Sequence, residues 1–322
     1  MNRKPAGKMT AMALVLGALV LIAVRAPATA APITLTYANF PPASTFPCVQ
    51  MERWSREVEK RTNGQVKINT FPGGTLLAAK NIFDGVISGT ADIGNFAMSY
   101  QPGRFPVSEA ADLPLGLPNA RVASLVLTDL IEKHQPKEFE KVKILTLFTC
   151  PPADFMTSKP VRTLKDLKGM ELRVSGTGVD VVKNLGGIPI AMPQSETPEA
   201  IQKGIVKGIV SSMEVLKDMN YAAYCPYATD TSLFIVSFAV VMNREKWNAL
   251  PADVKKVMDD LRVEQAEWTG KYVDNHVSEA LSWSKQKYNH QVIELPAADK
   301  AEIKKLVRPM SDAYVKKVGA QG

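Results

Sequence analysis

The chain is poor in the side chains on which metal centres and most catalytic sites depend. It has three cysteines and three histidines in 322 residues. No C-x-x-C, H-E-x-x-H, G-x-S-x-G or Walker-type phosphate loop occurs in it. None of the histidines has a serine, cysteine or carboxylate partner at the spacing of a catalytic motif. The sequence therefore predicts no metal site, no cofactor and no enzymatic activity.

The first thirty residues have the features of a signal peptide. Arg3, Lys4 and Lys8 precede an apolar stretch over residues 9–24, and Ala28-Thr29-Ala30 forms a small-x-small cleavage site. The apolar stretch is short for a helix that crosses a bilayer. We expect cleavage after Ala30, export, and a mature protein that is not embedded in the membrane. A retained amphipathic anchor is the alternative.

The chain that remains after this leader has only a small excess of charge. The formal net charge is +7, and the leader contributes four of these positive charges. The remaining +3 is spread along the chain rather than clustered. This argues against a nucleic-acid-binding protein and permits an anionic ligand.

The cysteine count limits covalent cross-links. In an oxidising compartment Cys48, Cys150 and Cys225 can form at most one disulfide, and the sequence does not say between which two. Buried free thiols are the simpler expectation.

Predicted strands and helices alternate along the chain. Strands expected at residues 33–38, 66–71 and 91–96 are separated by helices at 48–62 and 78–88. This order predicts right-handed crossovers in a mostly parallel sheet. About 290 residues follow the leader, too many for one ordinary core, so we expect an α/β fold in two lobes. Further strands are expected at 142–148, 170–174, 188–190, 205–211 and 235–242, and further helices at 121–133, 179–185, from 251 past 283, and at 298–318 with a kink at Pro309.

Arg173 is the strongest candidate for a ligand contact. Met170, Leu172 and Val174 alternate with Glu171 and Arg173 in a short predicted strand, which a loop and a helix follow. In open α/β sheets, ligands bind at the carboxyl ends of the strands. A guanidinium at that place offers a carboxylate two parallel donors, which a lysine cannot do. An arginine on the outer face of a surface strand is the alternative interpretation.

An ordered set of segments carries a family resemblance. The segments are 54–64 (WSREVEKRTNG), 71–76 (FPGGTL), 85–94 (GVISGTADIG), 157–161 (TSKPV), 164–174 (LKDLKGMELRV), 185–187 (LGG), Pro193, Ser195-Glu196, 200–204 (AIQKG) and 247–251 (WNALP). Together they resemble the periplasmic solute-binding proteins of TRAP transporters, the DctP family. In this resemblance Arg173 occupies the position of the carboxylate-binding arginine.

The resemblance implies a fold and a function. The fold is a two-lobed periplasmic-binding-protein fold with a cleft between the lobes, crossing hinge strands and a long bracing helix within residues 252–287. The implied lobes are residues 31–148 with about 235–278, and residues 149–234 with about 279–322. A small organic acid binds in the cleft, closes it, and is delivered to a membrane permease driven by an ion gradient. The implied location is the periplasm.

The resemblance also implies further ligand-binding positions. Phe40 and Thr45 lie in the loop after the first strand, and Asn95 and Phe96 follow the third strand. For each of these residues, packing or loop capping is the alternative role. The remaining candidates are Ser175, Gln194, Ser211 and Asp154.

The chain departs from its relatives where specificity is set. Ser211 stands where many relatives have an amide, and Gln194 replaces an aromatic residue found in some. Asp154 stands where some acid-sugar and dicarboxylate binders have a second arginine. An aspartate in the cleft would repel a second ligand carboxylate, so the sequence favours a monocarboxylate. The alternative is that Asp154 lies solvated at the rim of the cleft.

Two other classes of function remain open at this stage. One is a ligand-sensing protein that presents its closed state to a receptor instead of a permease. The other is an exported enzyme that uses Asp154 or Glu196 as a base, although isolated carboxylates are far more often solvated or structural.

Overall fold

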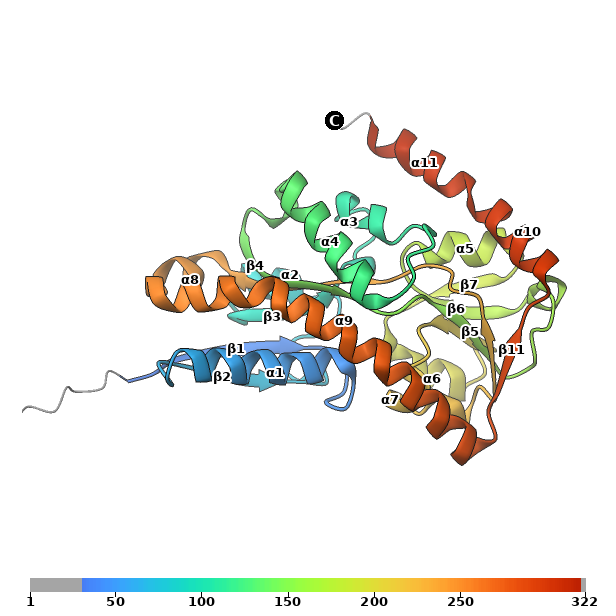
Figure 1. Cartoon of the computed structure of the whole chain (residues 1–322), viewed down its shortest axis with the longest axis horizontal. Helices are drawn as coiled ribbons and strands as arrows, with labels where there is room; N and C mark the ends of the chain where they lie inside the picture. The colour runs from blue at the N-terminus through green and yellow to red at the C-terminus, as the bar shows by residue number, and fades with distance from the viewer. Residues whose placement is uncertain (1–30, 320–322) are drawn as a thin grey trace, which may run out of the picture. The chain divides into compact units, whose positions relative to one another are not determined.

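The computed structural model describes residues 31–319, which form two sheets with helices packed against them (Figure 1). The expected leader and its cleavage site at Ala30 lie outside the described residues. None of the described helices is long and apolar enough to cross a membrane.

The first sheet has five strands in the order β2-β1-β3-β10-β4. Strands β1 (Ile33–Asn39), β2 (Val66–Phe71) and β3 (Ile93–Ala97) are parallel, as the alternating pattern predicts. Strand β10 (Ser237–Asn243) lies between β3 and β4 (Val142–Thr149) and is antiparallel to both. All seven of its residues are buried, which explains its continuous apolar sequence.

The second sheet has six strands in the order β11-β9-β5-β8-β6-β7. Strand β6 is parallel to β7 and β8, whereas β5 is antiparallel to β8 and β9. Strand β11 is parallel to β9. Each sheet is therefore mostly parallel, as the sequence predicts, with one antiparallel strand inserted in it, β10 in the first sheet and β5 in the second. The strands are β5 (Asp154–Thr157), β6 (Glu171–Val174), β7 (Ile188–Ala191), β8 (Gly208–Ser211), β9 (Tyr227–Asp230) and β11 (Gln291–Glu294).

Two short segments cross between the sheets. Residues 150–153 lead from β4 to β5, and residues 231–236 return from β9 to β10. The two segments are bonded to each other, because the Cys150 N–H donates to the Val236 carbonyl and the Ala153 N–H donates to the Phe234 carbonyl. These are the crossing hinge strands of the expected fold.

Helix α9 (Ala252–Tyr288) is the long bracing helix, with 37 residues. It packs against α1, α4 and β4 of the first sheet and against α7 beside the second sheet (Figure 1). Gly270 allows its close approach to α4, because a Cβ there would lie 2.4 Å from the Cα of Arg121. Pro251 immediately precedes its first residue, where the sequence predicts a helix start.

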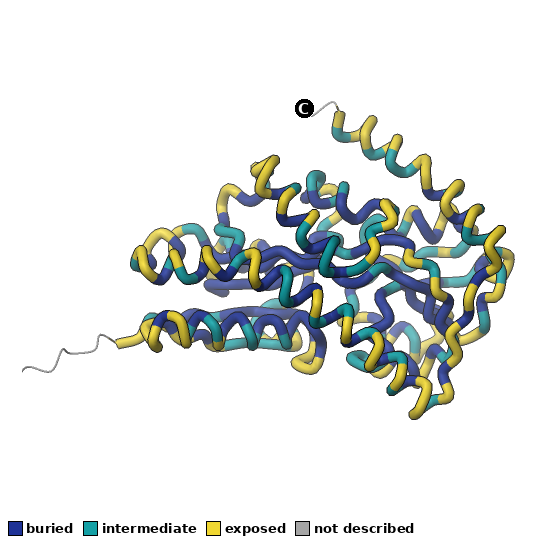
Figure 2. Tube along the Cα trace, viewed as in Figure 1, coloured by how far each residue is buried: buried dark blue, intermediate teal, exposed yellow. Residues whose placement is uncertain are grey.

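Most of the other helices pack against the two sheets, whose central strands are largely buried, whereas α11 has no buried residue (Figure 2). The expected C-terminal helix is two helices that meet at Arg308, since Pro309 has no N–H to continue the ladder. All three cysteines are free and buried. The α-helices are α1 (Phe46–Arg61), α2 (Ile82–Ile87), α3 (Pro106–Ala111), α4 (Ala120–His134), α5 (Gly178–Asn184), α6 (Thr197–Gln202), α7 (Val215–Asp218), α8 (Arg244–Ala249), α10 (Ala297–Val307) and α11 (Pro309–Val318), and short 3-10 helices are η1 (Met98–Tyr100), η2 (Lys137–Phe139), η3 (Leu164–Leu167), η4 (Gln194–Glu196) and η5 (Tyr221–Ala223).

Candidate functional site

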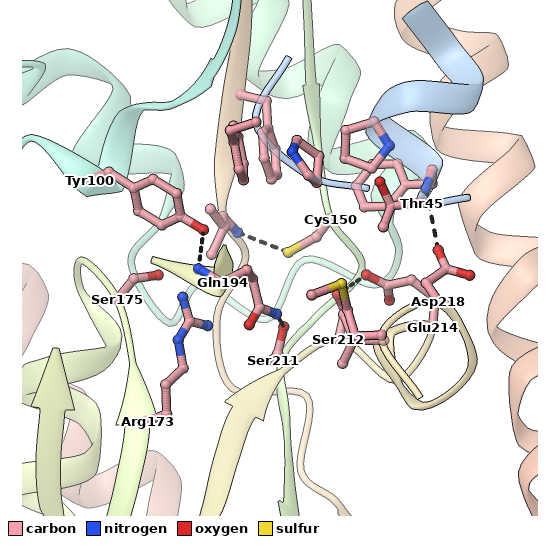
Figure 3. Close-up of a pocket in the computed structure, with 18 residues that line it drawn as sticks. Thr45, Tyr100, Cys150, Arg173, Ser175, Gln194, Ser211, Ser212, Glu214 and Asp218 are labelled. Carbon is pink, nitrogen blue, oxygen red and sulfur yellow. Dashed lines mark hydrogen bonds between the residues drawn. The ribbon is translucent and has the colours of Figure 1, made fainter. Parts of the chain in front are cut away.

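A pocket lies where the ends of both sheets and the crossing segments meet (Figure 3). The pocket, including the part that is open to solvent, encloses about 540 Å³. The lining residues from the first sheet and the crossing segments are Phe40, Pro41, Thr45, Phe46, Pro47, Tyr100, Cys150, Val236 and Phe238. Those from the second sheet and α7 are Arg173, Ser175, Gln194, Ser211, Ser212, Glu214, Val215, Asp218 and Met219.

Arg173 lies in β6 and is only 2% exposed. Its Nε and Nη2 both donate to the carbonyl of Met192, at 3.0 and 2.7 Å. The guanidinium points toward Tyr100 and Gln194 in the pocket (Figure 3). Among residues 31–319 no carboxylate forms an ion pair with it. A buried cation without a counter-charge is costly, so this arginine is suited to an anionic ligand.

Five other expected residues line the same pocket. They are Phe40, Thr45, Ser175, Gln194 and Ser211. Gln194 is the best fixed of them, because its Nε2 donates to Ser211 Oγ at 3.2 Å and its backbone N–H donates to the Tyr100 hydroxyl at 3.1 Å. The second of these bonds joins the two sheets across the pocket.

An aromatic wall forms the side of the pocket that belongs to the first sheet. Phe40 stacks on Phe238 with ring centroids 6.4 Å apart and meets Tyr100 edge-on at 5.3 Å. Phe46 meets Phe238 edge-on at 5.9 Å. Sequence reasoning missed Phe46, Tyr100 and Phe238. A helix start, a 3-10 turn and a buried central strand give each of these residues an ordinary packing role in the sequence.

An acidic corner, formed by Glu214 and Asp218, also escaped sequence reasoning. Asp218 accepts from the Phe46 N–H at 3.2 Å and from His276 Nε2 at 2.6 Å, and this contact with Asp218 is the main cause that raises the pKa of His276. Glu214 accepts from Ser212 Oγ at 2.7 Å, and burial raises its pKa to about 7. In sequence, two acids near a four-residue helix are typical of a solvated surface, so no pattern indicates their burial.

Three expected site residues do not line this pocket. Asn95 is fully buried within β3 and donates to Asn39 Oδ1 at 2.9 Å, which makes it part of the interior of the sheet. Phe96 points to the opposite face of β3, where its ring packs on Phe83 and Phe105. Neither of these two expected ligand contacts after the third strand therefore lines the pocket.

Asp154 is also placed elsewhere. Its Oδ1 accepts from the backbone N–H groups of Thr231 and Ser232, at 2.7 and 2.8 Å. The carboxylate therefore fixes the turn that begins the returning crossing segment, in which Ser232 has a φ of 48°. Asp154 therefore does not line the pocket, and its charge carries no argument here for a monocarboxylate.

Two sheets joined by crossing segments, with a pocket between them and a buried arginine that pairs with no carboxylate of residues 31–319, are the features of a solute-binding protein. The family model described as bacterial extracellular solute-binding protein, family 7 (DctP), matches residues 37–317. A TRAP periplasmic solute-binding protein from Desulfovibrio salexigens is 53% identical, with 91% of this chain and 92% of that chain covered and a TM-score of 0.81.

More distant relatives match the same family along most of their length. A TRAP periplasmic solute-binding protein from Bordetella bronchiseptica with bound (R)- and (S)-mandelate is 26% identical, with 90% of this chain and 94% of that chain covered and a TM-score of 0.85. The C4-dicarboxylate-binding periplasmic protein DctP of Rhodobacter capsulatus is 23% identical over 328 residues, 95% of each chain.

The chain therefore belongs to family 7 of the bacterial extracellular solute-binding proteins, the DctP family. It is the periplasmic solute-binding subunit of a TRAP transporter, binds a carboxylate ligand for transport, and is not an enzyme. The expected family, fold and role are confirmed.

Proposed function

We propose that the ligand is a monocarboxylate with an apolar, ring-sized body, bound with its carboxylate against Arg173. The observation that carries this proposal is the charge of the lining. Arg173 is the only cation among the described residues that line the pocket, and Glu214 and Asp218 line it as well. A second ligand carboxylate would find no cation and would approach two acids, which costs free energy.

The orientation of the guanidinium limits how the carboxylate binds. Nε and one hydrogen of Nη2 are engaged by the Met192 carbonyl. The other hydrogen of Nη2 and both hydrogens of Nη1 are left for a ligand, since a guanidinium has five N–H donors. The ligand carboxylate therefore binds across Nη1 and Nη2, with one oxygen on each nitrogen.

The aromatic wall receives the rest of the ligand. Phe40, Phe46, Phe238 and Tyr100 offer rings against which a flat or apolar body packs. Two relatives support this proposal: the Bordetella protein binds mandelate, an aromatic monocarboxylate, and in the Desulfovibrio structure the C-terminus of a symmetry mate occupies the ligand-binding site. Thr45, Ser175, Gln194 and Ser211 are the proposed polar contacts of the ligand.

The two sheets are the cores of the proposed lobes, residues 31–148 with about 235–278 and residues 149–234 with about 279–322. Closure is a hinge motion at residues 150–153 and 231–236, where the chain crosses between the sheets. The proposal includes cleavage of the signal peptide after Ala30, which releases the mature protein. The intact mass of protein from the periplasm tests it, and a membrane-bound species that retains residues 1–30 contradicts it.

The ligand class is tested by native mass spectrometry of protein purified under mild conditions, followed by a thermal-shift screen of matched acids. Benzoate, phenylacetate and mandelate are compared with phthalate, succinate, malate and fumarate. We expect a retained or best-stabilising acid with one carboxylate. If any dicarboxylate stabilises the protein more than every monocarboxylate, the proposed ligand class is wrong.

A further inference from the structure

Glu214 lines the pocket with a carboxylate that is only half satisfied. Oε1 accepts from Ser212 Oγ at 2.7 Å, whereas Oε2 is buried and has no hydrogen-bond partner in the described part of the chain. The residue as a whole is 2% exposed, as little as Arg173. Buried polar atoms are almost always paired, so an oxygen without a partner in a pocket wall is free to accept a hydrogen bond from a bound molecule.

The side chains around Glu214 are already engaged with other partners. Asp218 holds the Phe46 N–H and His276, and Cys150 Sγ accepts from the Val236 N–H at 3.2 Å. Arg173, the cation of the lining, lies on the other side of the pocket, with Gln194 and Ser211 between the two in the view of Figure 3. The pocket thus has a cationic end at Arg173 and an acidic end at Glu214.

We propose that Glu214 Oε2 accepts a hydrogen bond from the ligand, which is therefore a monocarboxylate with a protonated amine at the end far from its carboxylate. This inference rests on the proposed function, because it requires the carboxylate to be anchored at Arg173. An amine is favoured over a hydroxyl because two acids, Glu214 and Asp218, occupy this end of the pocket against one imidazole, that of His276. Burial raises the pKa of Glu214 to about 7, and a ligand cation would restore its ionised form.

Isosteric benzoates test this pairing. Calorimetry compares benzoates that carry an aminomethyl, a hydroxymethyl or an ethyl group at position 3 or 4, which match in shape and differ in the donor. We expect the better aminomethyl isomer to bind the unmodified protein at least about tenfold more tightly than the ethylbenzoate with the same substitution position. Glu214→Gln should weaken aminomethyl binding roughly 30-fold and leave ethyl binding within about threefold.

The control is Glu199→Gln, the same chemical change on an exposed acid that pairs with Lys203 in α6, and it should change none of these affinities. Two results would contradict the proposed role of Glu214 and leave the monocarboxylate proposal intact. One is that the unmodified protein binds the ethylbenzoates most tightly. The other is that the Glu214→Gln variant binds the ethylbenzoates normally and still prefers the aminomethylbenzoates. If isophthalate or terephthalate binds best, the monocarboxylate proposal itself fails. A hydroxymethyl preference that Glu214→Gln removes would retain the contact and replace the amine by a hydroxyl.

Two outcomes need a second measurement. If the Glu214→Gln variant does not fold, the affinities of the unmodified protein test the proposal, because it must still bind the aminomethylbenzoate more tightly than the ethylbenzoate. If the parent binds none of these benzoates, the acid retained on purification decides: one without a hydrogen-bond donor beyond its carboxylate overturns the proposal, and one with an amine supports it.

Discussion

The two walls of the pocket are built from different kinds of side chain. The wall from the first sheet is aromatic, with Phe40, Phe46, Phe238 and Tyr100 packed ring against ring. The wall from the second sheet and α7 carries all the charged side chains among the described lining residues, Arg173, Glu214 and Asp218. One wall therefore has the chemistry to bind the ligand body, and the other has the chemistry to bind its charged groups.

This division has a physical basis in how each wall is held. Aromatic rings at the edge of a core lose little when water leaves, so they form a surface that is nearly complete before the ligand arrives. Charged groups pay a large desolvation cost on closure and recover it only when a complementary group binds. We therefore expect changes in the polar wall to have the larger effect on affinity, and changes in the aromatic wall to alter which bodies are accepted.

Loss of the arginine is the largest expected effect. Arg173→Ala leaves the ligand carboxylate in a closed pocket without a cation, which costs on the order of 3–5 kcal/mol, or roughly a hundredfold to several thousandfold in affinity. Arg173→Lys should also bind poorly, because one ammonium cannot span two carboxylate oxygens. Calorimetry with the best acid measures both, and Arg104→Ala, a half-buried arginine that pairs with Asp84 away from the pocket, is the control. An affinity of Arg173→Ala within about threefold of the parent would contradict the anchor.

Asp154 tests whether charge outside the pocket matters. Asp154→Ala leaves the N–H groups of Thr231 and Ser232 without their acceptor, so the free energy of unfolding should fall by about 2–4 kcal/mol. The affinity for the ligand should stay within about threefold, since the side chain does not line the pocket. Denaturant unfolding measures the stability and calorimetry measures the affinity. A large loss of affinity in a folded variant would show that Asp154 contributes to ligand binding.

The pH dependence of Asp154→Asn provides a second readout. Burial raises the pKa of Asp154 from 3.8 to about 7, so its contribution to stability is fully present below pH 3.8 and is lost as pH rises through 7. Asparagine keeps an acceptor for both N–H groups and does not titrate. Relative to the parent, the variant should gain up to about 4 kcal/mol in unfolding free energy between pH 4 and pH 7. An unchanged difference across this range would mean that Asp154 stays ionised when buried.

Much of the fold could be predicted from the sequence because local signals and tertiary structure agree there. Strand β1 and helix α1 follow clear periodicity, and the start of α9 follows Pro251. The sequence predicts no strand where β5 and β9 lie, and the pairing of these two strands depends on the crossing segments. Strands β5 and β10 are inserted antiparallel to their neighbours because the chain enters each of them directly from a segment that crosses between the sheets. No local sequence pattern indicates this insertion.

The site was predictable in part for the same reason. Arg173 stands at a strand end, where topology alone indicates a ligand. Asn95 and Phe96 share such a position, but their side chains are held by Asn39 and by Phe83 and Phe105. The aromatic wall and the acidic corner are assembled from distant segments, as the contact between Asp218 and the Phe46 N–H illustrates, so only the three-dimensional structure reveals them.

The aromatic wall should control the shape of the ligand. Phe40→Leu removes the ring that stacks on Phe238 and meets Tyr100, and we expect aromatic acids to lose about 1–2 kcal/mol of binding free energy while aliphatic acids lose less. Phe96→Leu is the matched control, because Phe96 is buried on the far face of β3 and should alter stability without altering this preference. Equal losses for both classes of acid would show that the wall does not distinguish them.

The smallest expected effect concerns the bond that joins the two walls. Tyr100→Phe removes the acceptor of the Gln194 N–H, a contact made only while the first-sheet and second-sheet sides are together, and a hydrogen bond of this kind is worth about 1 kcal/mol. Since the bond favours the closed state and does not involve the proposed anchor, every acid should lose a similar two- to tenfold in affinity and their ranking should not change. Calorimetry with one aromatic and one aliphatic monocarboxylate measures this, and Tyr288→Phe, whose hydroxyl bonds Asn220 away from the pocket, is the control. A loss confined to aromatic acids would instead make Tyr100 a contact of the ligand ring, and the tyrosine would then act with the aromatic wall rather than as a link between the two.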